Sequence, residues 1–301
     1  MNIKGIIVNQ QGEKVEATAP VIISASRSTD IPAFYAKWFF NRLAKGYCTW
    51  YNPFNINQKM YISFERCRVI VFWTKNPAPI IPYLPELDKR GIHYYFQVTL
   101  NDYVKEGFEP NVPSVDERVE TFRKLSSLIG KEKVIWRFDP LIITPNIGPR
   151  ELLTRIWHIG NKLKGYTDKL VFSFVDVKAY RKVQNNLVKE TLFFTKDDVE
   201  NAEVNHAQRI EIVEGLKKIR EVWHNDGWDV EMATCAEDID LKAYGIEHNR
   251  CIDGELMKRI FADDKELVYY LHTLKWPERD MFGEIPPIPK KPKNVKDTGQ
   301  R

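Results

Sequence analysis

The chain has 301 residues and a net charge of +4, with 43% apolar side chains and four cysteines. Such a chain can bury one large core, and none of its apolar runs approaches the ~18 residues of a membrane span. The whole charge excess lies in residues 285–301, which hold five cations and one aspartate. We therefore expect a cytoplasmic protein with a small-molecule ligand, without a membrane partner and without the clustered cations of a nucleic-acid-binding protein.

Three regions follow one another along the chain. Residues 3–8 and 15–19 flank Gln-Gln-Gly and predict a small hairpin, so residues 1–20 are expected to cap the fold. Residues 21–284 are expected to form the main domain. The segment 285–301 is rich in Pro and Lys, and its composition predicts a flexible basic tail.

Six short apolar runs divide the main domain, and a stretch of helical character follows each one. They are VIISAS (21–26), VIVFW (69–73), YYF (94–96), VIW (134–136), LVFSFV (170–175) and VEMA (230–233). Runs of this kind are typical of parallel strands buried on both faces. Together they predict an α/β fold, an open partial (β/α)6 TIM-like barrel.

The segments between the runs predict helices over 33–44, 115–129, 149–163, 199–223 and 253–261. Ser114 precedes the second of these, with Glu117 three residues later, which is the spacing of a capping box. Residues 50–64 are expected to be irregular, and a long polar insertion follows the fifth strand.

Polar side chains stand at the end of every predicted strand. In a β/α barrel the reacting groups occupy the loops that follow the strands, so we expect these side chains to converge. They are Arg27, Thr29 and Asp30 after the first strand, Lys75 and Asn76 after the second, Gln97 and Thr99 in the third, Arg137 and Asp139 in the fourth, Asp176 after the fifth, and Cys235 and Glu237 after the sixth.

We interpret Arg27, Thr29, Asp30, Asn76, Gln97, Thr99, Arg137 and Asp176 as candidates for binding a substrate or cofactor. Arg27 and Arg137 can grip a carboxylate or phosphate, although an Arg27–Asp30 ion pair would satisfy the same positions. Gln97 and Thr99 alternate with apolar residues and should share one face. The mixture of charges favours a zwitterionic or phosphorylated small molecule.

Lys75, Asp139, Cys235 and Glu237 are the catalytic candidates. A buried Lys75 can act as a base or as a Schiff-base nucleophile, but anion binding or a salt bridge would suit it equally well. Carboxylates at several strand ends can also bind a divalent metal. Because histidine is nearly absent from these positions, no metal ligand is assigned.

Six motifs, in order, resemble an uncharacterised prokaryotic family, domain of unknown function 1848. They are Ser-Ala-Ser-Arg-Ser-Thr-Asp-Ile-Pro-Ala-Phe-Tyr (24–35), Phe-Trp-Thr-Lys-Asn-Pro (72–77), Val-Ile-Trp-Arg-Phe-Asp-Pro (134–140), Ser-Phe-Val-Asp (173–176), Thr-Cys-Ala-Glu (234–237) and Tyr-Gly-Ile-Glu-His-Asn-Arg-Cys-Ile-Asp (244–253). The resemblance implies a relative of radical S-adenosylmethionine enzymes, with S-adenosylmethionine and a [4Fe–4S] cluster as cofactors. In such chemistry Cys235 could deliver a hydrogen atom or cap a substrate radical, and an inert buried thiol is the alternative.

Members of that family usually carry a C-terminal C-x-x-x-C-x-x-C segment, whose three thiolates would hold three irons of the cluster. Cys48, Cys67, Cys235 and Cys251 do not have this spacing. A Cys-rich partner, a missing C-terminal module, or loss of the cluster would each explain the difference. We expect a radical S-adenosylmethionine-related barrel enzyme, or the barrel component of a split one. A cluster-free lyase or hydrolase and a catalytically inactive binding or regulatory barrel are the alternatives.

Overall fold

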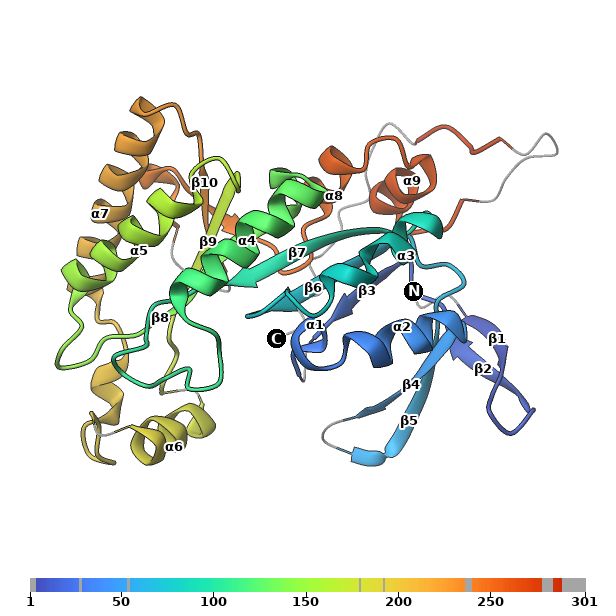
Figure 1. Cartoon of the computed structure of the whole chain (residues 1–301), viewed down its shortest axis with the longest axis horizontal. Helices are drawn as coiled ribbons and strands as arrows, with labels where there is room; N and C mark the ends of the chain where they lie inside the picture. The colour runs from blue at the N-terminus through green and yellow to red at the C-terminus, as the bar shows by residue number, and fades with distance from the viewer. Residues whose placement is uncertain are drawn as a thin grey trace.

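The computed structural model describes residues 4–26, 29–52, 55–178, 180–191, 193–235, 240–277 and 284–288. Within these residues, parallel strands form a seven-stranded sheet whose order in space follows their order in the chain, although the chain visits a second sheet between the first two of them (Figure 1). In spatial order they are β3 (Ile22–Ala25), β6 (Val69–Thr74), β7 (His93–Thr99), β8 (Val134–Leu141), β9 (Lys169–Phe174), β10 (Glu231–Cys235) and β11 (Ile246–Asn249). The described strands do not close on themselves, because β3 and β11 each have one unpaired edge there.

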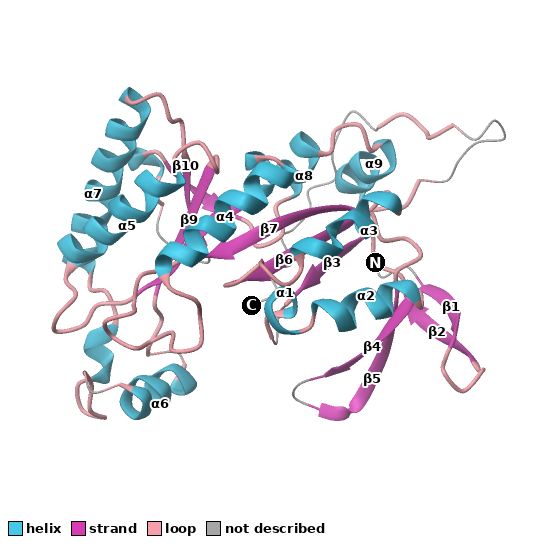
Figure 2. Cartoon of the chain, in the orientation of Figure 1, coloured by secondary structure: helices cyan, strands magenta, loops and turns pink. Residues whose placement is uncertain are grey.

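Helices connect the strands (Figure 2). The α-helices of the described chain are α1 (Ile31–Phe34), α2 (Ala36–Ala44), α3 (Leu84–Lys89), α4 (Val115–Ile129), α5 (Pro149–Leu163), α6 (Arg181–Glu190), α7 (His206–Asn225), α8 (Gly254–Ile260) and α9 (Lys265–Thr273). Short 3-10 helices are η1 (Ile81–Tyr83), η2 (Lys131–Lys133), η3 (Val199–Ala202) and η4 (Lys242–Tyr244).

Alternate residues of each strand point to opposite faces of the sheet, and most residues of these strands are apolar, so both faces are apolar. We call the face covered by α2, α3, α4, α5 and α7 the outer face and the opposite one the inner face. On the outer face, Phe72, Phe96 and Trp136 belong to the large core that includes the apolar sides of α2, α3, α4, α5 and α7. On the inner face, Val71 and Tyr95 belong to a second, smaller core. A strand with two apolar faces reads as a continuous apolar run, which is the signal by which the sequence predicts these strands.

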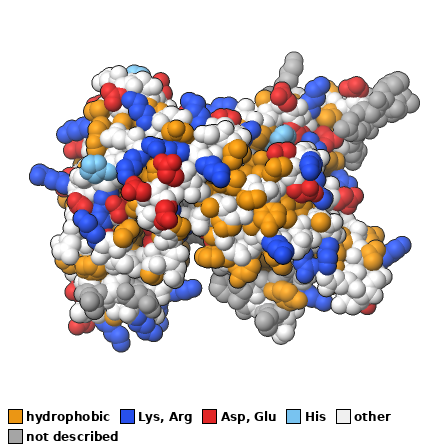
Figure 3. Space-filling view, in the orientation of Figure 1, with side chains coloured by type: hydrophobic (Ala, Val, Ile, Leu, Met, Phe, Trp, Pro, Cys, Tyr) orange, Lys and Arg blue, Asp and Glu red, His pale blue; other side chains and the backbone are white. Residues whose placement is uncertain are grey.

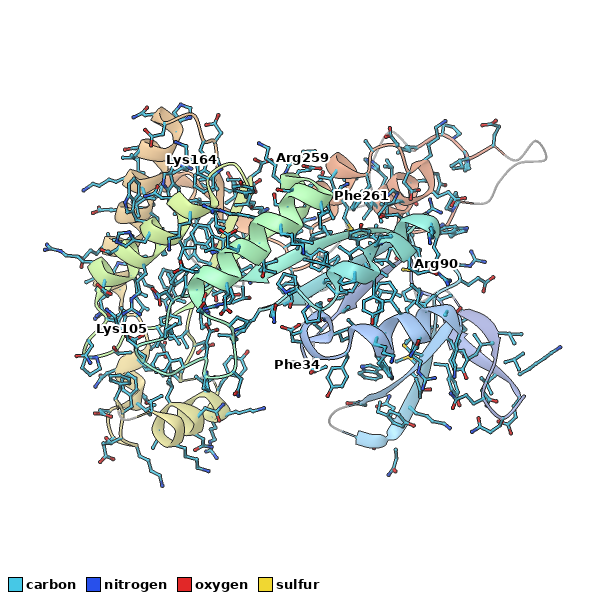
Figure 4. The ribbon with its side chains drawn as sticks, in the orientation of Figure 1. Phe34, Arg90, Lys105, Lys164, Arg259 and Phe261 are labelled. Atoms are coloured by element: carbon cyan, nitrogen blue, oxygen red, sulfur yellow. The ribbon has the colours of Figure 1, made fainter. Side chains whose placement is uncertain are left out.

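Helices α8 and α9 cover the inner face toward the amino ends of the strands. Leu256 and Met257 of α8 and Leu267 of α9 are buried there against the strands. Phe261, labelled in Figure 4, ends α8. Its ring stacks on that of His93 at the start of β7, with 4.5 Å between the ring centroids. The inner face is therefore packed at one end, and its polar residues lie at the other.

The sheet curves toward its inner face. Cys251 lies two residues beyond the end of β11, a reach of at most about 7 Å. Its carbonyl oxygen nevertheless accepts a hydrogen bond of 2.9 Å from Gln97 Nε2 on β7. In a flat sheet the four strand spacings between β11 and β7 would be about 19 Å. A single glutamine side chain cannot span the remainder, so β7 and β11 approach each other across the inner face.

A second, four-stranded sheet has the order β1-β2-β5-β4. Strands β1 (Lys4–Val8) and β2 (Lys14–Thr18) form the predicted hairpin, while β4 (Tyr47–Asn52) pairs antiparallel with β5 (Asn55–Ser63). The expectation that residues 50–64 are irregular is therefore wrong. Their aromatic and β-branched residues favour strands, and β2 supplies a further neighbour for β5 through Thr18 and Ile62.

Other differences from the sequence prediction have similar causes. Strand β11 was not expected, because Ile-Glu-His-Asn at a sheet edge lacks an apolar run. The polar insertion contains α6, and α9 follows α8. Helices α4 and α5 have the predicted bounds, and both hydrogen bonds of the Ser114–Glu117 capping box are present. Most of the expected tail, from residue 289 on, lies outside the described residues, so its flexibility and the three-region division stay predictions.

Phe34 of α1 and Trp38 of α2 are 68% and 41% exposed. Hydrophobic side chains form a patch in this region of the surface (Figure 3). Among the described helices, none combines the length and apolar character needed to cross a bilayer.

Asp264, at the start of α9, links this helix to the amino end of the sheet through Arg68 and His93. Burial raises the pKa of Asp264, but hydrogen bonds from His93, from the Leu267 backbone and from Arg68 outweigh burial and lower it to about 2. The ionised form thus stabilises the folded state above the ordinary aspartate pKa of about 3.9, and this contribution is lost as the pH falls toward about 2. Asp264→Asn should lower the free energy of unfolding at pH 7 by about 2 kcal/mol.

Urea unfolding at pH 7 and at pH 3 measures this effect. The difference between the Asp264→Asn variant and the wild type should shrink at the lower pH, whereas Asp263→Asn, at the exposed neighbouring position, should match the wild type at both. Equal losses at the two pH values would show that the carboxylate charge is not the cause.

Candidate functional site

The candidate site lies on the inner face, one step along the strands from the apolar core. The alternation that places Val71, Tyr95 and Ile135 in that core places the next residues of the same strands on the same side. The side chains brought there are Ser24 of β3, Trp73 of β6, Gln97 of β7, Arg137 and Asp139 of β8, Ser173 of β9 and Cys235 of β10. These positions are at or near the carboxyl ends of parallel strands, where open α/β sheets bind their ligands.

Arg137 is the centre of this group, and its side chain is only 3% exposed. The guanidinium lies over the Trp73 ring, 4.8 Å from the ring centroid. Its Nη1 donates to Gln97 Oε1 at 2.8 Å, and its Nε donates to Asp139 Oδ2 at 3.0 Å. Burial favours the uncharged form, but Asp139 and Cys235 more than compensate, so the pKa of Arg137 is raised and the residue stays cationic.

Asp139 and Trp73 are held from their other sides. The Ser173 hydroxyl donates to Asp139 Oδ1, while Asn101 contacts both the backbone N–H and the carbonyl of Asp139. Trp73 Nε1 donates to Ser24 Oγ at 3.1 Å. Side chains from five adjacent strands therefore fix the orientation of the Arg137 guanidinium.

Cys235 and Cys251 form a close pair beside Arg137, with 3.5 Å between their sulfur atoms. The thiol of Cys251 hydrogen-bonds to Cys235 and Arg137 attracts its negative charge; together they outweigh burial and lower the pKa of Cys235 to about 6. The same contact, together with burial, raises the pKa of Cys251. Of the two thiols, Cys235 is therefore the more acidic and Cys251 the one that holds its proton more tightly.

The segment 250–253 carries Cys251 across the inner face. Besides the Gln97 contact, the Asp253 backbone N–H lies 3.4 Å from the Tyr95 hydroxyl, and the Asp253 carboxylate accepts from Lys169 Nζ at 3.1 Å. Asp253 also caps α8 through the Leu256 N–H. Cys251 is therefore held by contacts with β7 and β9 as well as by its own strand β11.

Other predicted residues lie at the same edge but have separate partners. Asp30 caps α1 through the Ala33 N–H and accepts from the Lys75 backbone N–H at 2.7 Å, which indicates a structural role for this carboxylate. Lys75 Nζ pairs with Glu109 at 2.5 Å, and its side chain is 46% exposed. Lys75 is therefore not the buried lysine that the catalytic prediction assumes.

The remaining candidates are less closely involved in the Arg137 group. The Asn76 side chain accepts from the Ala78 N–H, Thr99 pairs with Arg137 in the sheet, and Thr29 and Asp176 are exposed. Arg27 and Glu237 lie outside the described residues. Arg137, Asp139, Gln97 and Cys235 are thus the predicted residues that come together.

Ser24, Trp73, Ser173 and Cys251 were missed as site residues. The two-residue alternation could have identified Trp73 and Ser173, because each follows an inner-face valine by two positions in its strand. Cys251 could not be assigned from spacing, because its position depends on β11 and on the path of the segment that follows.

The cysteines do not provide the thiolate set of a [4Fe–4S] cluster. Cys48 lies in β4, and Cys67 is buried directly before β6, near the amino end of that strand. Cys235 and Cys251 lie near the carboxyl ends and supply only two sulfurs. Within the described ranges, no three His, Cys, Asp or Glu side chains are arranged to bind a metal ion. The donor set on this chain therefore does not fit the cluster.

The pH dependence of alkylation tests the thiolate assignment. Iodoacetamide reacts with thiolates, so the rate at Cys235 should rise through about pH 6 and then level off. Cys251→Ala removes the donor to the sulfur and should move the midpoint up by about 1–2 pH units. Cys251→Ser, which keeps an O–H donor, should move it less. Peptide mass spectrometry at Cys235 measures the rates, and a wild-type midpoint above pH 8 would contradict the assignment.

The chain was compared with known proteins by sequence. The profile of a family described as Domain of unknown function (DUF1848) matches residues 22–281. This range includes Arg137, the residues that contact it, and both Cys235 and Cys251. No curated protein matches the chain. Because the match spans well over half of the sequence, the chain belongs to the DUF1848 family.

Proposed function

We propose that the chain is an enzyme built on an open, partial β/α barrel, in which the Cys235 thiolate reacts with a zwitterionic small molecule. The observation that carries this proposal is the pairing of Cys235 with Cys251 and Arg137 at the carboxyl ends of the strands. A thiolate is the nucleophilic form of cysteine, and sites that lower its pKa are often reactive. The curvature of the sheet and its sequential strand order support the barrel.

The charges of the site favour a zwitterion over a phosphorylated ligand. At neutral pH the described group contains one cation, Arg137, and two anions, Asp139 and the Cys235 thiolate. Lys75, expected to add a positive charge, is paired with Glu109. A ligand with a positive centre near Cys235 would complement this excess of negative charge, whereas the two negative charges of a phosphate would add to it.

In this proposal Arg137 and Asp139 hold the site rather than react. The Arg137 donors are directed to Gln97 and Asp139, and its charge stabilises the thiolate. Cys251 keeps the second proton of the pair. Covalent attack would form a bond from Cys235 Sγ to an electrophilic atom of the substrate, whose leaving group departs with the bonding electrons.

The family resemblance supports a second candidate, the barrel component of a radical S-adenosylmethionine-related enzyme. The specific observation is that the inner-face site exists while the chain's own thiols do not form a cluster set. In this reading S-adenosylmethionine is the zwitterionic ligand, and cysteines on another polypeptide would supply the cluster. The purified chain should then hold no [4Fe–4S] cluster after anaerobic reconstitution alone, and about four irons per chain would contradict this reading.

Ligand protection of Cys235 tests the proposed function. Purified wild-type chain is alkylated with iodoacetamide at pH 7. Parallel samples contain S-adenosylmethionine, another zwitterionic small molecule or a phosphorylated one as the protecting ligand. A zwitterion should protect Cys235 saturably, and a phosphorylated compound should protect it less. For any protecting compound that is converted, Cys235→Ser should lower turnover by about 1,000-fold or more, whereas Cys67→Ser should not.

Two results would count against the proposal. Turnover that survives in the Cys235→Ser variant would remove the thiolate from the reaction. Protection without conversion under any condition would instead favour a binding or regulatory barrel.

A further inference from the structure

Cys235 and Cys251 have a geometry that goes beyond a single reactive thiolate. Their sulfur atoms are 3.5 Å apart, although the residues are 16 positions apart in the chain. The register of β10 and β11 causes this proximity, because Cys235 pairs with Asn249 and Cys251 lies two residues further on. Their closeness is thus built into the parallel pairing of two strands.

Little movement would join the two sulfurs. A disulfide has an S–S length of about 2.05 Å, so the sulfurs must approach by roughly 1.5 Å. Cys235 is fixed at the end of β10, but residues 250–253 are outside regular structure and precede α8. Cys251 is also exposed, so its side can be reached from solvent.

The two thiols are electronically different, as the two partners in thiol–disulfide exchange are. The hydrogen bond from the Cys251 thiol, and then the charge of Arg137, stabilise negative charge on Cys235. Cys251 retains its proton while that charge is present, because two adjacent thiolates would repel each other. The first cysteine is ready to attack, and the second can resolve the product.

We propose that Cys235 and Cys251 form a dithiol–disulfide couple that exchanges with small-molecule disulfides. Cys235 is the attacking residue and Cys251 the resolving residue. The couple uses the same thiolate as the proposed reaction, but it requires no substrate to be turned over and is therefore tested independently.

The exchange proceeds in two displacements. The Cys235 thiolate attacks one sulfur of a disulfide RSSR, forming Cys235–S–SR and releasing RS⁻. The released RS⁻ takes the proton of Cys251. The Cys251 thiolate then attacks the Cys235 sulfur, forming the internal disulfide and releasing a second RS⁻. In total two electrons pass from the protein pair to RSSR, one proton moves to RSH, and the net charge is unchanged.

Oxidation would alter the site in two ways. It removes the thiolate beside Arg137, so Asp139 becomes the main compensating charge of that guanidinium. It also draws residues 250–253 toward β10, and the Gln97 hydrogen bond to the Cys251 carbonyl is the contact placed to register this movement. Because the disulfide consumes the Cys235 thiolate, iodoacetamide should not alkylate Cys235 in the oxidised protein. Treatment with a dithiol reductant should restore the alkylation.

Oxidised glutathione is the probe for the test. The wild-type chain is incubated with it at pH 7, quenched with acid, dissolved in denaturant that contains N-ethylmaleimide and digested for peptide mass spectrometry. The expected product is one linked peptide pair containing Cys235 and Cys251, with Cys48 and Cys67 blocked by the maleimide. Cys251→Ser should instead accumulate a mixed glutathione disulfide on Cys235, and Cys67→Ser should behave as the wild type.

Three outcomes would overturn the proposal. In the first, the wild-type chain keeps both thiols free under conditions that oxidise dithiothreitol. In the second, the wild-type chain stops at a mixed disulfide. In the third, the Cys235→Ser variant forms a mixed disulfide on Cys251 while the Cys251→Ser variant forms none. The wild-type measurement does not depend on the folding of a variant. If the disulfide forms but no substrate reacts, the proposed function fails while the couple stands; turnover without disulfide formation would show the reverse.

Discussion

The buried positive charge of Arg137 is the constraint on which the rest of the site depends. Removing a guanidinium from water costs several kcal/mol unless neighbouring groups compensate the charge. Asp139, Gln97 and the Trp73 ring provide this compensation from three strands. The thiolate of Cys235 adds a second negative charge from β10. Asp139, Trp73 and Gln97 are in turn held by Ser173, Ser24 and the Cys251 carbonyl. Most of these side chains lie on neighbouring strands, so the register of the sheet sets how the Arg137 guanidinium is oriented.

This arrangement separates the stability of the fold from its chemistry along the inner face. Toward the amino ends, α8 and α9 bury apolar side chains against the strands, and Asp264 joins α9 to Arg68 and His93. Toward the carboxyl ends, polar side chains replace apolar ones within the same alternating pattern. The segment 250–253 joins the two regions, since Asp253 caps α8 and Cys251 contacts Cys235. A change in the state of the cysteine pair therefore acts on a segment attached to the packed end.

The sequence predicts the parallel strands well because burial on both faces leaves continuous apolar runs. It also locates Gln97, Arg137, Asp139 and Cys235 at strand ends, where the structure brings them together. It does not predict β11, whose short polar sequence has no such run, nor the path of the chain that places Cys251 beside Cys235. Lys75 illustrates a different limit: a lysine after a buried strand can turn outward to a loop carboxylate, here Glu109, and the sequence does not indicate that choice.

The central claim is that Arg137 stabilises a Cys235 thiolate at neutral pH, and a titration of the cysteine β-carbons by NMR in isotope-labelled protein tests it most directly. Assignment by the four single Cys→Ser variants identifies each resonance. The account predicts that the Cys235 signal titrates near pH 6 and that Arg137→Gln moves its midpoint upward. Signals from Cys48 and Cys67 should change only under strongly alkaline conditions, because burial raises their pKa values to about 11 and about 12. A Cys235 signal that remains that of a thiol through pH 8, or one that Arg137→Gln leaves unmoved, would contradict the account.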